Sequence, residues 1–349
     1  MILHVIKSNI YSGAENVVCR IINGLSDRED FIYLAPHGPI EDKLKSIGLY
    51  DKYRSIDSFS ISEIKKAVDA LHPDIVQAHD FTASVLSAFA LKGSVPLISH
   101  IHCNPLWLKK KLHPNSISYL LASKYISRIL AVSDSIKEEY CYSNKLRCPI
   151  TTIGNPFSIE SVKTAIEPDV SAGLSSDILY VGRFNEAKNP LGFIQIIEAY
   201  KKENPTTSLC VKMVGNGELL EECKAYVSTH NLTDAISFEG FSNNVYNYMA
   251  ATGILLMPSL FEGFGLVALE AMTLGKPVVC SGVGGLSDII DDSCGYICHD
   301  TADYCSRLNT LLTDPDTYQL KSRGAISKAA AFDNVAAYLD NLESIYRSL

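Results

Sequence analysis

Short apolar runs alternate with amphipathic helical patterns along the whole chain, and the series occurs twice. Strands separated by helices predict parallel sheets covered by helices on both faces. Two series therefore predict an α/β protein with two doubly wound, Rossmann-like parallel-sheet domains, for which 349 residues are sufficient. The expected strands are 2–7, 31–35, 74–78, 95–101 and 128–132, then 177–181, 208–214, 235–238, 253–257, 277–281 and 296–298. Helices are expected at 14–25, 61–71, 82–92 and 116–127.

The boundary between the two domains is expected within 155–176. This stretch has no strong periodicity and contains Pro156, Gly173 and several serines. We place the first domain at 1–160 and the second at 161–332. The remaining segment, 333–349, is predicted as an amphipathic helix because its apolar side chains recur at helical spacing.

The composition is that of a soluble globular protein, with 47% hydrophobic and 20% charged residues. No apolar run is long enough to span a bilayer, and the N-terminus lacks the pattern of a secretion signal. The ten cysteines show no paired spacing, so we interpret them as reduced thiols. These features predict a cytoplasmic protein.

Charge is distributed unevenly. The formal net charge is −8, yet residues 1–155 are mildly basic and the remainder is strongly acidic. Such asymmetry is typical of a protein in which one domain faces an anionic partner. A pI of about 5.6 and the lack of a dense basic patch argue against nucleic-acid binding.

The most informative motif is EGFGLVALE, from Glu262 to Glu270, which follows an apolar strand. A glycine-containing turn between strand and helix leaves backbone N–H groups and the positive helix end free for a ligand. Glu270 lies in an otherwise apolar helix, where a carboxylate is costly unless it is hydrogen-bonded. Two vicinal hydroxyls, as on a ribose, would satisfy both of its oxygens. The alternative is a partner within the protein or solvent.

A second motif, YVGRFNEAKNP, places Arg183 and Lys188 between a strand and a predicted helix start at Asn189-Pro190. Two cations beside a helix N-terminus suit a diphosphate, because Arg binds in a fork and Lys acts as a point charge. The alternative is a pair of solvated loop charges.

The N-terminal half carries a glycine loop and several histidines. Gly13 lies between the first strand and the first helix, where the backbone can approach a phosphate. The loop is not G-x-G-x-x-G, which argues against a nicotinamide oxidoreductase. His79 ends one strand, and His100 and His102 share a face of the next. We interpret His102 as a ligand-facing residue; satisfied core or metal-binding histidines are the alternative, although no Cys/His spacing of a structural zinc site is present.

Two further segments have competing interpretations. Asp314-Pro315-Asp316 matches a D-x-D pattern of divalent-cation sites, but it begins a predicted helix, where Asp is a favoured cap. We therefore assign no metal ligand. Trp107–His113, WLKKKLH, puts a tryptophan beside three lysines. Such a segment suits an anionic membrane surface or a phosphorylated acceptor; a solvated loop is the alternative.

Taken together, these motifs resemble those of retaining family 4 glycosyltransferases with the GT-B architecture, also described as glycosyltransferase group 1. The resemblance covers nearly the whole chain. Its most specific part is the spacing of Glu262 and Glu270, and RFNEAKNP is nearly as specific. TIGNPF, VGNGEL and FEGF also match the family pattern. The first loop departs from it, because it reads SGAE where many relatives have two adjacent glycines.

The resemblance implies a role for each matching residue. Arg183 and Lys188 would bind the donor diphosphate, and Glu262 would bind hydroxyls of the transferred sugar. Glu270 would bind the nucleotide ribose, and His102 would lie near the donor sugar and the acceptor. Further donor contacts would come from Gly13, Gly215, Phe241, Phe264, Gly265 and Leu266.

The resemblance also implies a domain arrangement and a reaction. The first domain would be the acceptor side and the second would bind the donor, with the active site in the cleft between them and the terminal helix packed back on the first domain. The donor would be a UDP-sugar, with a GDP-sugar as the alternative, and the acceptor a glycan or a lipid-linked or protein-linked molecule. Transfer of a hexose or N-acetylhexosamine would retain anomeric configuration and need neither cofactor nor metal. Polysaccharide or glycoconjugate biosynthesis in the cytoplasm, with peripheral membrane contact of the first domain, is expected.

Two other functions stay open as alternatives. An epimerase or hydrolase acting on sugar nucleotides would need additional acid and base groups, and the sequence shows no convincing set. A non-catalytic partner subunit that binds sugar nucleotides would be expected to lack site residues. Arg183, Lys188, Glu262 and Glu270 are all present.

Overall fold

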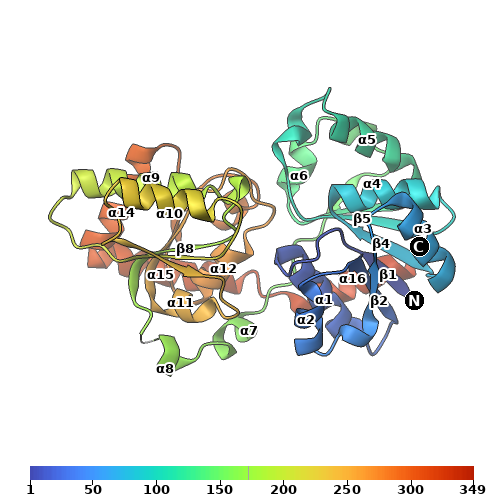
Figure 1. The fold of residues 1–349 in the computed structure, drawn as a ribbon, viewed down its shortest axis with the longest axis horizontal. Coiled ribbons are helices and arrows are strands. Elements are labelled where there is room, and N and C mark those ends of the chain that lie inside the picture. The colour runs from blue at the N-terminus through green and yellow to red at the C-terminus, as the bar shows by residue number, and fades with distance from the viewer. Residues whose placement is uncertain (172) are drawn as a thin grey trace. The chain divides into compact units, whose positions relative to one another are not determined.

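A computed structural model describes residues 1–171 and 173–349. The chain forms two compact units (Figure 1). The first unit consists of Met1–Pro156 and Val335–Leu349, and the second of Phe157–Asn334. Each contains a parallel sheet with helices around it, so the expected fold class of two Rossmann-like α/β domains is confirmed.

The sheet of the first unit has seven strands in the order β3-β2-β1-β4-β5-β6-β7, and all paired strands are parallel. The sequence predicted all of them within a few residues except β3 and β7, which lie at the two edges. The strands are β1 Ile2–Val5, β2 Phe31–Pro36, β3 Tyr53–Ile56, β4 Ile75–His79, β5 Leu97–Ile101, β6 Arg128–Ala131 and β7 Ile150–Thr152.

The helices of the first unit form two groups of contacts. α3, α4 and α5 pack in series, and the terminal helix α16 packs against α1. Gly24 on α1 allows this approach, because a Cβ there would lie 2.3 Å from Leu339 Cδ1 on α16. The helices are α1 Gly13–Leu25, α2 Ile40–Ser46, α3 Ile61–Leu71, α4 Asp80–Leu91, α5 Pro114–Ala122, α6 Asp134–Glu139 and α16 Val335–Arg347.

The sheet of the second unit has six parallel strands in the order β10-β9-β8-β11-β12-β13. The strands are β8 Ser176–Val181, β9 Val211–Val214, β10 Ile236–Gly240, β11 Thr252–Met257, β12 Val278–Ser281 and β13 Gly295–Cys298. The helices are α7 Ile159–Thr164, α8 Pro168–Ser171, α9 Pro190–Glu203, α10 Leu220–Thr229, α11 Tyr246–Ala251, α12 Leu266–Thr273, α13 Leu286–Ile289, α14 Thr301–Thr313 and α15 Pro315–Ala330.

Both faces of this second sheet are buried, because successive side chains of each strand point to opposite faces. Ile178 and Tyr180 on β8 belong to a core cluster with residues of α9, α10 and α14. Leu179, between them, belongs to a second cluster with residues of α12 and α15. Figure 1 shows α9, α10 and α14 on one side of this sheet and α11, α12 and α15 on the other. The near-continuous apolar strands of the sequence have this origin.

The order of strands reverses once in each sheet, between β1 and β4 in the first and between β8 and β11 in the second. Connections leave such a point toward opposite faces, which opens a crevice at the carboxyl ends of the two strands. His79 ends β4, and Lys188 and Glu262 lie in the loops after β8 and β11. The topology therefore places these sequence-predicted residues at the switch points.

The structure also shows the caps that the sequence predicted. Asn189 is the N-cap of α9 and accepts a hydrogen bond from Gly192 N at 3.1 Å. Asp314 is the N-cap of α15 and accepts from Asp316 N and Thr317 N at 3.1 and 3.2 Å. The D-x-D segment thus has the structural role that we expected. Within 1–171 and 173–349, no helix is both long enough and apolar enough to cross a membrane.

Candidate functional site

The two motifs predicted to bind the donor are joined by hydrogen bonds in the second unit. Asn189 Nδ2 donates to the carbonyl of Pro258 at 3.0 Å, and Leu260 N donates to the carbonyl of Ala187 at 2.9 Å. These contacts connect the β8–α9 loop to the β11–α12 loop across the switch point. Lys188 and Glu262, which are 74 residues apart in the sequence, therefore belong to one site.

An ion pair between Lys188 Nζ and Glu262 Oε2 lies at the centre of this site. The Lys188 side chain is 25% exposed and that of Glu262 12% exposed, so a ligand can reach both. Arg183, in the same loop as Lys188, is exposed. Its guanidinium is in no ion pair within the described part of the chain. The site therefore offers an ammonium and a guanidinium, which suit phosphate oxygens, and a carboxylate, which suits sugar hydroxyls.

The start of α12 adds backbone donors. Gly265 is the N-cap of this helix with φ of 101°, and no side chain caps the first turn. Glycine adopts this left-handed backbone conformation without steric cost, whereas other residues rarely adopt it. A Cβ at this position would also lie 3.0 Å from Leu286 Cδ2. Ala268 N donates to the carbonyl of Gly265 at 3.0 Å, so Leu266 and Val267 are the residues whose N–H groups the helix itself leaves without a partner. Phe264 is half-buried just before this turn.

Glu270 lies one turn further along α12 and is half-buried. Tyr246 Oη on α11 donates a hydrogen bond to Glu270 Oε1 at 3.1 Å. One carboxylate oxygen of Glu270 thus has a hydrogen-bond partner within the protein, which is the alternative that the sequence left open. A ribose contact stays a prediction.

Gly215 and Phe241 lie in the loops after β9 and β10. Gly215 has φ of 142°, and a Cβ there would lie 1.9 Å from the carbonyl oxygen of Gly182. Contact between two loops of the protein therefore requires this glycine, whatever a ligand requires. Phe241 is 63% exposed. Its proposed contact with a base is not visible in the structure, and it stays a prediction.

Sequence reasoning missed the loop GVGG, 282–285, which follows β12. Gly285 N donates to the carbonyl of Glu262 at 3.3 Å. A Cβ at Gly285 would lie 2.4 Å from the carbonyl oxygen of Phe264. This loop supports the backbone of 262–264, and its signal was a glycine-rich turn directly after a predicted strand.

In the first unit, four histidines gather at the switch point; three lie on the neighbouring strands β1, β4 and β5, and His102 directly follows β5. His4 Nδ1 lies 2.9 Å from His79 Nε2, and His79 Nδ1 lies 2.9 Å from His102 Nε2. The ring centroids of His100 and His102 are 4.1 Å apart. Sequence reasoning missed His4, because one histidine in an apolar strand resembles a core residue. Its register partner is Gln77, two residues before His79.

Burial sets the protonation of this cluster. It lowers the pKa of His4 to about 3, and it holds the pKa of His79 and of His100 well below the usual range. The pKa of His102 is also lowered by burial, but the Asp80 carboxylate opposes this effect. Neutral imidazoles with lone pairs are the form that metals bind. Among the residues described, His79, His100 and His102 are the one group of at least three such side chains close enough to share an ion, with one ligand atom each within 4.8 Å of the others.

A cavity of about 480 Å³ lies beside His79 in the first unit. Apolar side chains dominate its wall, and Trp107 packs edge-on against Phe81 with ring centroids 4.8 Å apart. Glu15, which is 2% exposed, and Asp80 supply carboxylates. The predicted phosphate contact Gly13 directly precedes Ala14 of the wall, and a Cβ at Gly13 would meet nothing within 4 Å. The sequence did not single out Glu15 as a site residue.

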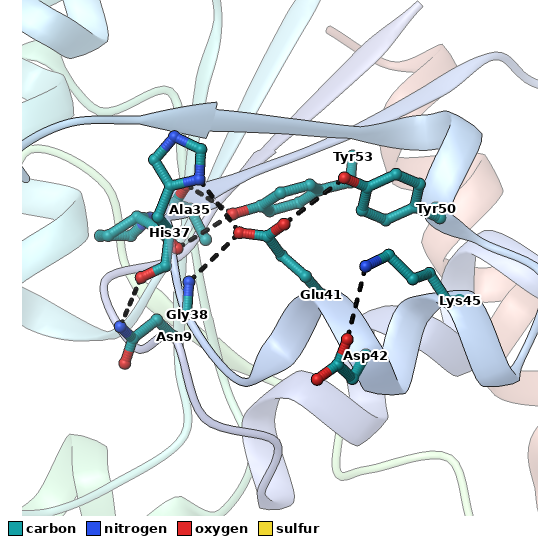
Figure 2. A network of polar contacts seen from close by, with 10 residues as sticks. Asn9, Ala35, His37, Gly38, Glu41, Asp42, Lys45, Tyr50 and Tyr53 are labelled. Atoms are coloured by element: carbon teal, nitrogen blue, oxygen red, sulfur yellow. Dashed lines mark hydrogen bonds and ion pairs between the residues drawn. The ribbon is translucent and has the colours of Figure 1, made fainter.

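A polar network fixes the first loop, which borders this cavity (Figure 2). Glu41 on α2 lies 3.0 Å from His37 Nδ1 and accepts hydrogen bonds from Gly38 N at 3.3 Å and Tyr50 Oη at 3.4 Å. The contact with His37 is the largest of the causes that lower the pKa of the Glu41 carboxyl. Asn9 Nδ2 donates to the carbonyl of His37 at 2.7 Å. The loop between β1 and α1 is thereby tied to the loop between β2 and α2.

The segment with the single tryptophan is more structured than a solvated loop. The Trp107 ring is stacked on that of His113, with centroids 5.8 Å apart, whereas Leu112 between them is 89% exposed. The three lysines at 109–111 are exposed as well. Further exposed apolar side chains from this segment and α5 are Leu106, Ile117 and Leu121.

Two family models match the chain. The model described as "Glycosyltransferase Family 4" matches residues 11–161, and the model described as "Glycosyl transferases group 1" matches residues 167–331. The chain is 24% identical over 308 residues to the UDP-Gal:alpha-D-GlcNAc-diphosphoundecaprenol alpha-1,3-galactosyltransferase of Escherichia coli, covering 83% of this chain and 79% of that protein. It is 28% identical over 255 residues to an uncharacterised glycosyltransferase of Methanocaldococcus jannaschii, covering 66% of this chain and 64% of that protein, just under two thirds of its length.

Solved structures show the same fold. The crystal structure of Anabaena HepE in complex with UDP-glucose matches this chain with a TM-score of 0.85 and 20% sequence identity. The match covers 100% of this chain and 99% of the HepE chain.

Proposed function

Because the chain belongs to the family 4 glycosyltransferases and has their two-domain GT-B fold, we propose that it transfers a sugar from a UDP-linked donor to an acceptor. The sugar is a hexose or an N-acetylhexosamine, and transfer retains the anomeric configuration. The acceptor is a growing glycan or a lipid-linked saccharide. The observation that carries the proposal is the joining of Lys188 and Glu262 at the switch point of the second sheet.

The second unit supplies the groups that a nucleotide-sugar donor needs. Arg183, Lys188 and the N-terminus of α12 stabilise the negative charge that grows on the leaving diphosphate. Glu262 accepts hydrogen bonds from sugar hydroxyls, and Glu270 binds the ribose. The choice of UDP is supported by a relative named for UDP-galactose and by a structural neighbour that holds UDP-glucose.

With two cations and a helix N-terminus at the diphosphate, no metal is needed to stabilise the leaving group, and transfer continues in the presence of EDTA. The departing phosphate takes the proton of the acceptor hydroxyl, so no separate protein base is required. The sugar–phosphate bond breaks as the bond to the acceptor oxygen forms on the same face. Loss of transfer after chelation would contradict this part of the proposal.

The cavity of the first unit is the proposed acceptor site. Its apolar wall and the edge-on pair of Trp107 and Phe81 suit a molecule with an apolar part. Its two carboxylates, on Glu15 and Asp80, suit saccharide hydroxyls. A lipid-linked saccharide combines both features, and the Escherichia coli relative is named for a diphosphoundecaprenol-linked acceptor.

The first test is a thermal-shift screen against UDP, UDP-sugars and GDP-sugars. Ligand at about 100 times its dissociation constant adds roughly 2.7 kcal/mol of stability. A shift with UDP-sugars, lost in Lys188→Ala and Glu262→Ala, is the expected result. Lys328→Ala is the control, because it removes a different ion pair of the second unit, with Asp291. A shift with GDP-sugars alone would overturn the donor assignment.

The same variants are then assayed for transfer to a lipid-linked saccharide. Lys188→Ala and Glu262→Ala abolish transfer while the protein stays folded, and Lys328→Ala transfers normally. Full transfer by both site variants would overturn the site. An epimerised sugar nucleotide formed without acceptor would favour the epimerase alternative.

We propose that the exposed lysines at 109–111 and the exposed Leu112 give the first unit a peripheral contact with an anionic membrane. Such a surface places the cavity next to a membrane-borne acceptor. Co-sedimentation with vesicles of neutral lipid with and without phosphatidylglycerol tests it. Binding is expected to require the anionic lipid and to be lost when the three lysines are changed to Glu. Changing Lys65 and Lys66 on α3 to Glu is the control, and equal loss in both variants would contradict a specific surface.

A further inference from the structure

We infer that His4, His79 and His102 form a hydrogen-bonded chain that fixes the proton of His102 on Nδ1, so that His102 donates an N–H to an oxygen of the substrate. His79 and His4 are then positioning residues for His102. The identity of the oxygen, on the sugar donor or the acceptor, rests on the proposed function. The proton arrangement itself does not.

The chain consists of two contacts of equal length. His4 Nδ1 and His79 Nε2 are 2.9 Å apart, and so are His79 Nδ1 and His102 Nε2. Both nitrogens of His79 are therefore used. Burial keeps the three rings neutral, and a neutral imidazole has one N–H and one lone pair.

Counting protons leaves two arrangements. Three neutral rings carry three protons, and the two contacts hold two of them. The third lies at one end of the chain, on His4 Nε2 or on His102 Nδ1. In the part of the chain that the structure describes, neither of these buried atoms has a hydrogen-bond partner.

The two ends differ in their surroundings. His4 is 0% exposed and stacked on Phe31 with ring centroids 5.5 Å apart, so a proton on its Nε2 would be a buried donor that no ligand reaches. His102 is half-buried, and its backbone N–H donates to Asp80 Oδ1 at 2.8 Å. The negative carboxylate favours the proton at this end. The third proton is thus on His102 Nδ1, an atom that is itself buried in the structure, so a ligand oxygen accepts it only after the half-buried side chain becomes accessible.

A second hydrogen-bonded chain, from Tyr346 through Gln77 to His100, keeps His100 out of the chain formed by His4, His79 and His102. Tyr346 Oη on α16 donates to Gln77 Oε1, which orients the amide so that Gln77 Nε2 donates to His100 Nδ1 at 2.9 Å. A neutral His100 then carries its proton on Nε2, and neither of its nitrogens has a lone pair left for a metal. In this arrangement the three clustered histidines hold protons and no shared ion.

The first chain ends inside the protein, and this limits its chemistry. No partner among the described residues continues it beyond His4, so a proton that left His102 could not be replaced from solvent along this route. His102 therefore acts through a hydrogen bond that it donates, not as a general base supplied by the chain.

Long-range ¹H–¹⁵N correlation spectra of protein labelled at histidine test the proton positions without turnover. His102 signals are assigned with a His102→Gln variant. The expected spectrum shows a protonated Nδ1 and an unprotonated Nε2 for His102. A protonated Nε2 in the wild-type protein, or a stoichiometric transition metal found by mass spectrometry, would overturn the inference. A protein without transfer activity gives the same spectrum, so failure of the proposed function stays distinguishable.

Two variants then separate positioning from packing. His79→Phe removes the partner of His102 Nε2, so the proton of His102 is expected to move to Nε2 and kcat to fall at least about tenfold, with the donor KM nearly unchanged. Tyr346→Phe breaks the second chain alone and is expected to leave the His102 spectrum and kcat unchanged. An unchanged kcat in folded His79→Phe, or an equal fall in both variants, would contradict the assignment. If His79→Phe does not fold, His4→Phe, which is expected to give a mixture of both His102 forms, replaces it.

Discussion

Gly215 and Gly13 of the candidate site have different surroundings, so substitution by alanine is expected to change protein stability at the first position and not at the second. At Gly215 a Cβ would collide with the carbonyl oxygen of Gly182 at 1.9 Å, and φ is 142°. Gly215→Ala is therefore expected to lower the free energy of unfolding of the second unit by about 2 kcal/mol or more. Urea unfolding measures this change, and stability equal to wild type would contradict the loop geometry.

Gly13→Ala is the matched variant in the first unit. A Cβ there meets nothing within 4 Å, so stability is expected to change by less than about 0.5 kcal/mol. If the backbone at Gly13 approaches a donor phosphate, as the family resemblance implies, transfer nevertheless falls. Unchanged transfer in a stable Gly13→Ala protein would remove Gly13 from the site.

Glu270 gives a prediction about binding. Its Oε1 accepts a hydrogen bond from Tyr246 at 3.1 Å, and a proposed ribose contact uses the carboxylate charge. Glu270→Gln is expected to weaken UDP binding by about tenfold, because hydrogen bonds to a charged group contribute about 1.5–3 kcal/mol. Isothermal titration calorimetry with UDP measures this effect. Tyr246→Phe serves as control, and an equal or larger loss there would assign Glu270 to a structural role.

The positions of residues could be predicted where a loop carried the signal, whereas their roles stay predictions. Arg183, Lys188 and Glu262 follow predicted strands, and parallel strands bring their loops to one edge. His4 could not be predicted in this way. Its role depends on strand register with Gln77 and on contact with His79, which sequence spacing alone does not contain.

Among the elements, the central strands were predictable and the edge strands were not. Strands buried on both faces give continuous apolar runs. The edge strand β3 has two exposed residues between Tyr53 and Ile56, and β7 has two exposed threonines after Ile150. Consecutive side chains point to opposite faces, so both faces of these edge strands are partly open to solvent and no continuous apolar run is needed. α4 began two residues before its expected start, at Asp80, whose positive φ of 67° sequence periodicity does not show.

The terminal helix α16 carries a prediction about packing. Tyr338, Leu339, Leu342 and Tyr346 are buried on one side of it. Leu342→Ala is expected to lower the free energy of unfolding of the first unit by about 2–4 kcal/mol, because the deletion leaves a cavity. The exposed Ser344→Ala on the same helix is the control. Similar stability of both variants in urea unfolding would show that α16 is not needed for the first unit.

At the scale of the whole molecule, the two units are expected to respond differently to acid. His4, His79, His100 and His102 are buried in the first unit, and burial lowers the pKa of each. The two histidines of the second unit, His230 and His299, are exposed. Lys202 and His230 lower the pKa of Glu198 in the second unit to about 2, so this carboxylate titrates below the pH range compared.

The sign of the effect follows from proton uptake. Below a pH of about 6.5 the unfolded chain protonates these histidines and the folded unit does not. The free energy of unfolding of the first unit therefore falls as pH falls, by up to about 1.4 kcal/mol per pH unit for each buried histidine. The stabilisation is fully present above the unfolded pKa and is lost as pH falls toward the lowered folded values.

The single tryptophan of the chain, Trp107, belongs to the first unit, so its fluorescence reports the unfolding of that unit. Urea midpoints followed by this signal are expected to drop between pH 7 and pH 5, and more steeply than midpoints followed by a probe attached to the second unit. His4→Phe removes one buried imidazole and is expected to flatten the pH dependence of the tryptophan signal. Equal midpoints at both pH values would mean that the cluster takes up protons while folded, which would contradict both its neutral state and the proton order inferred for His102.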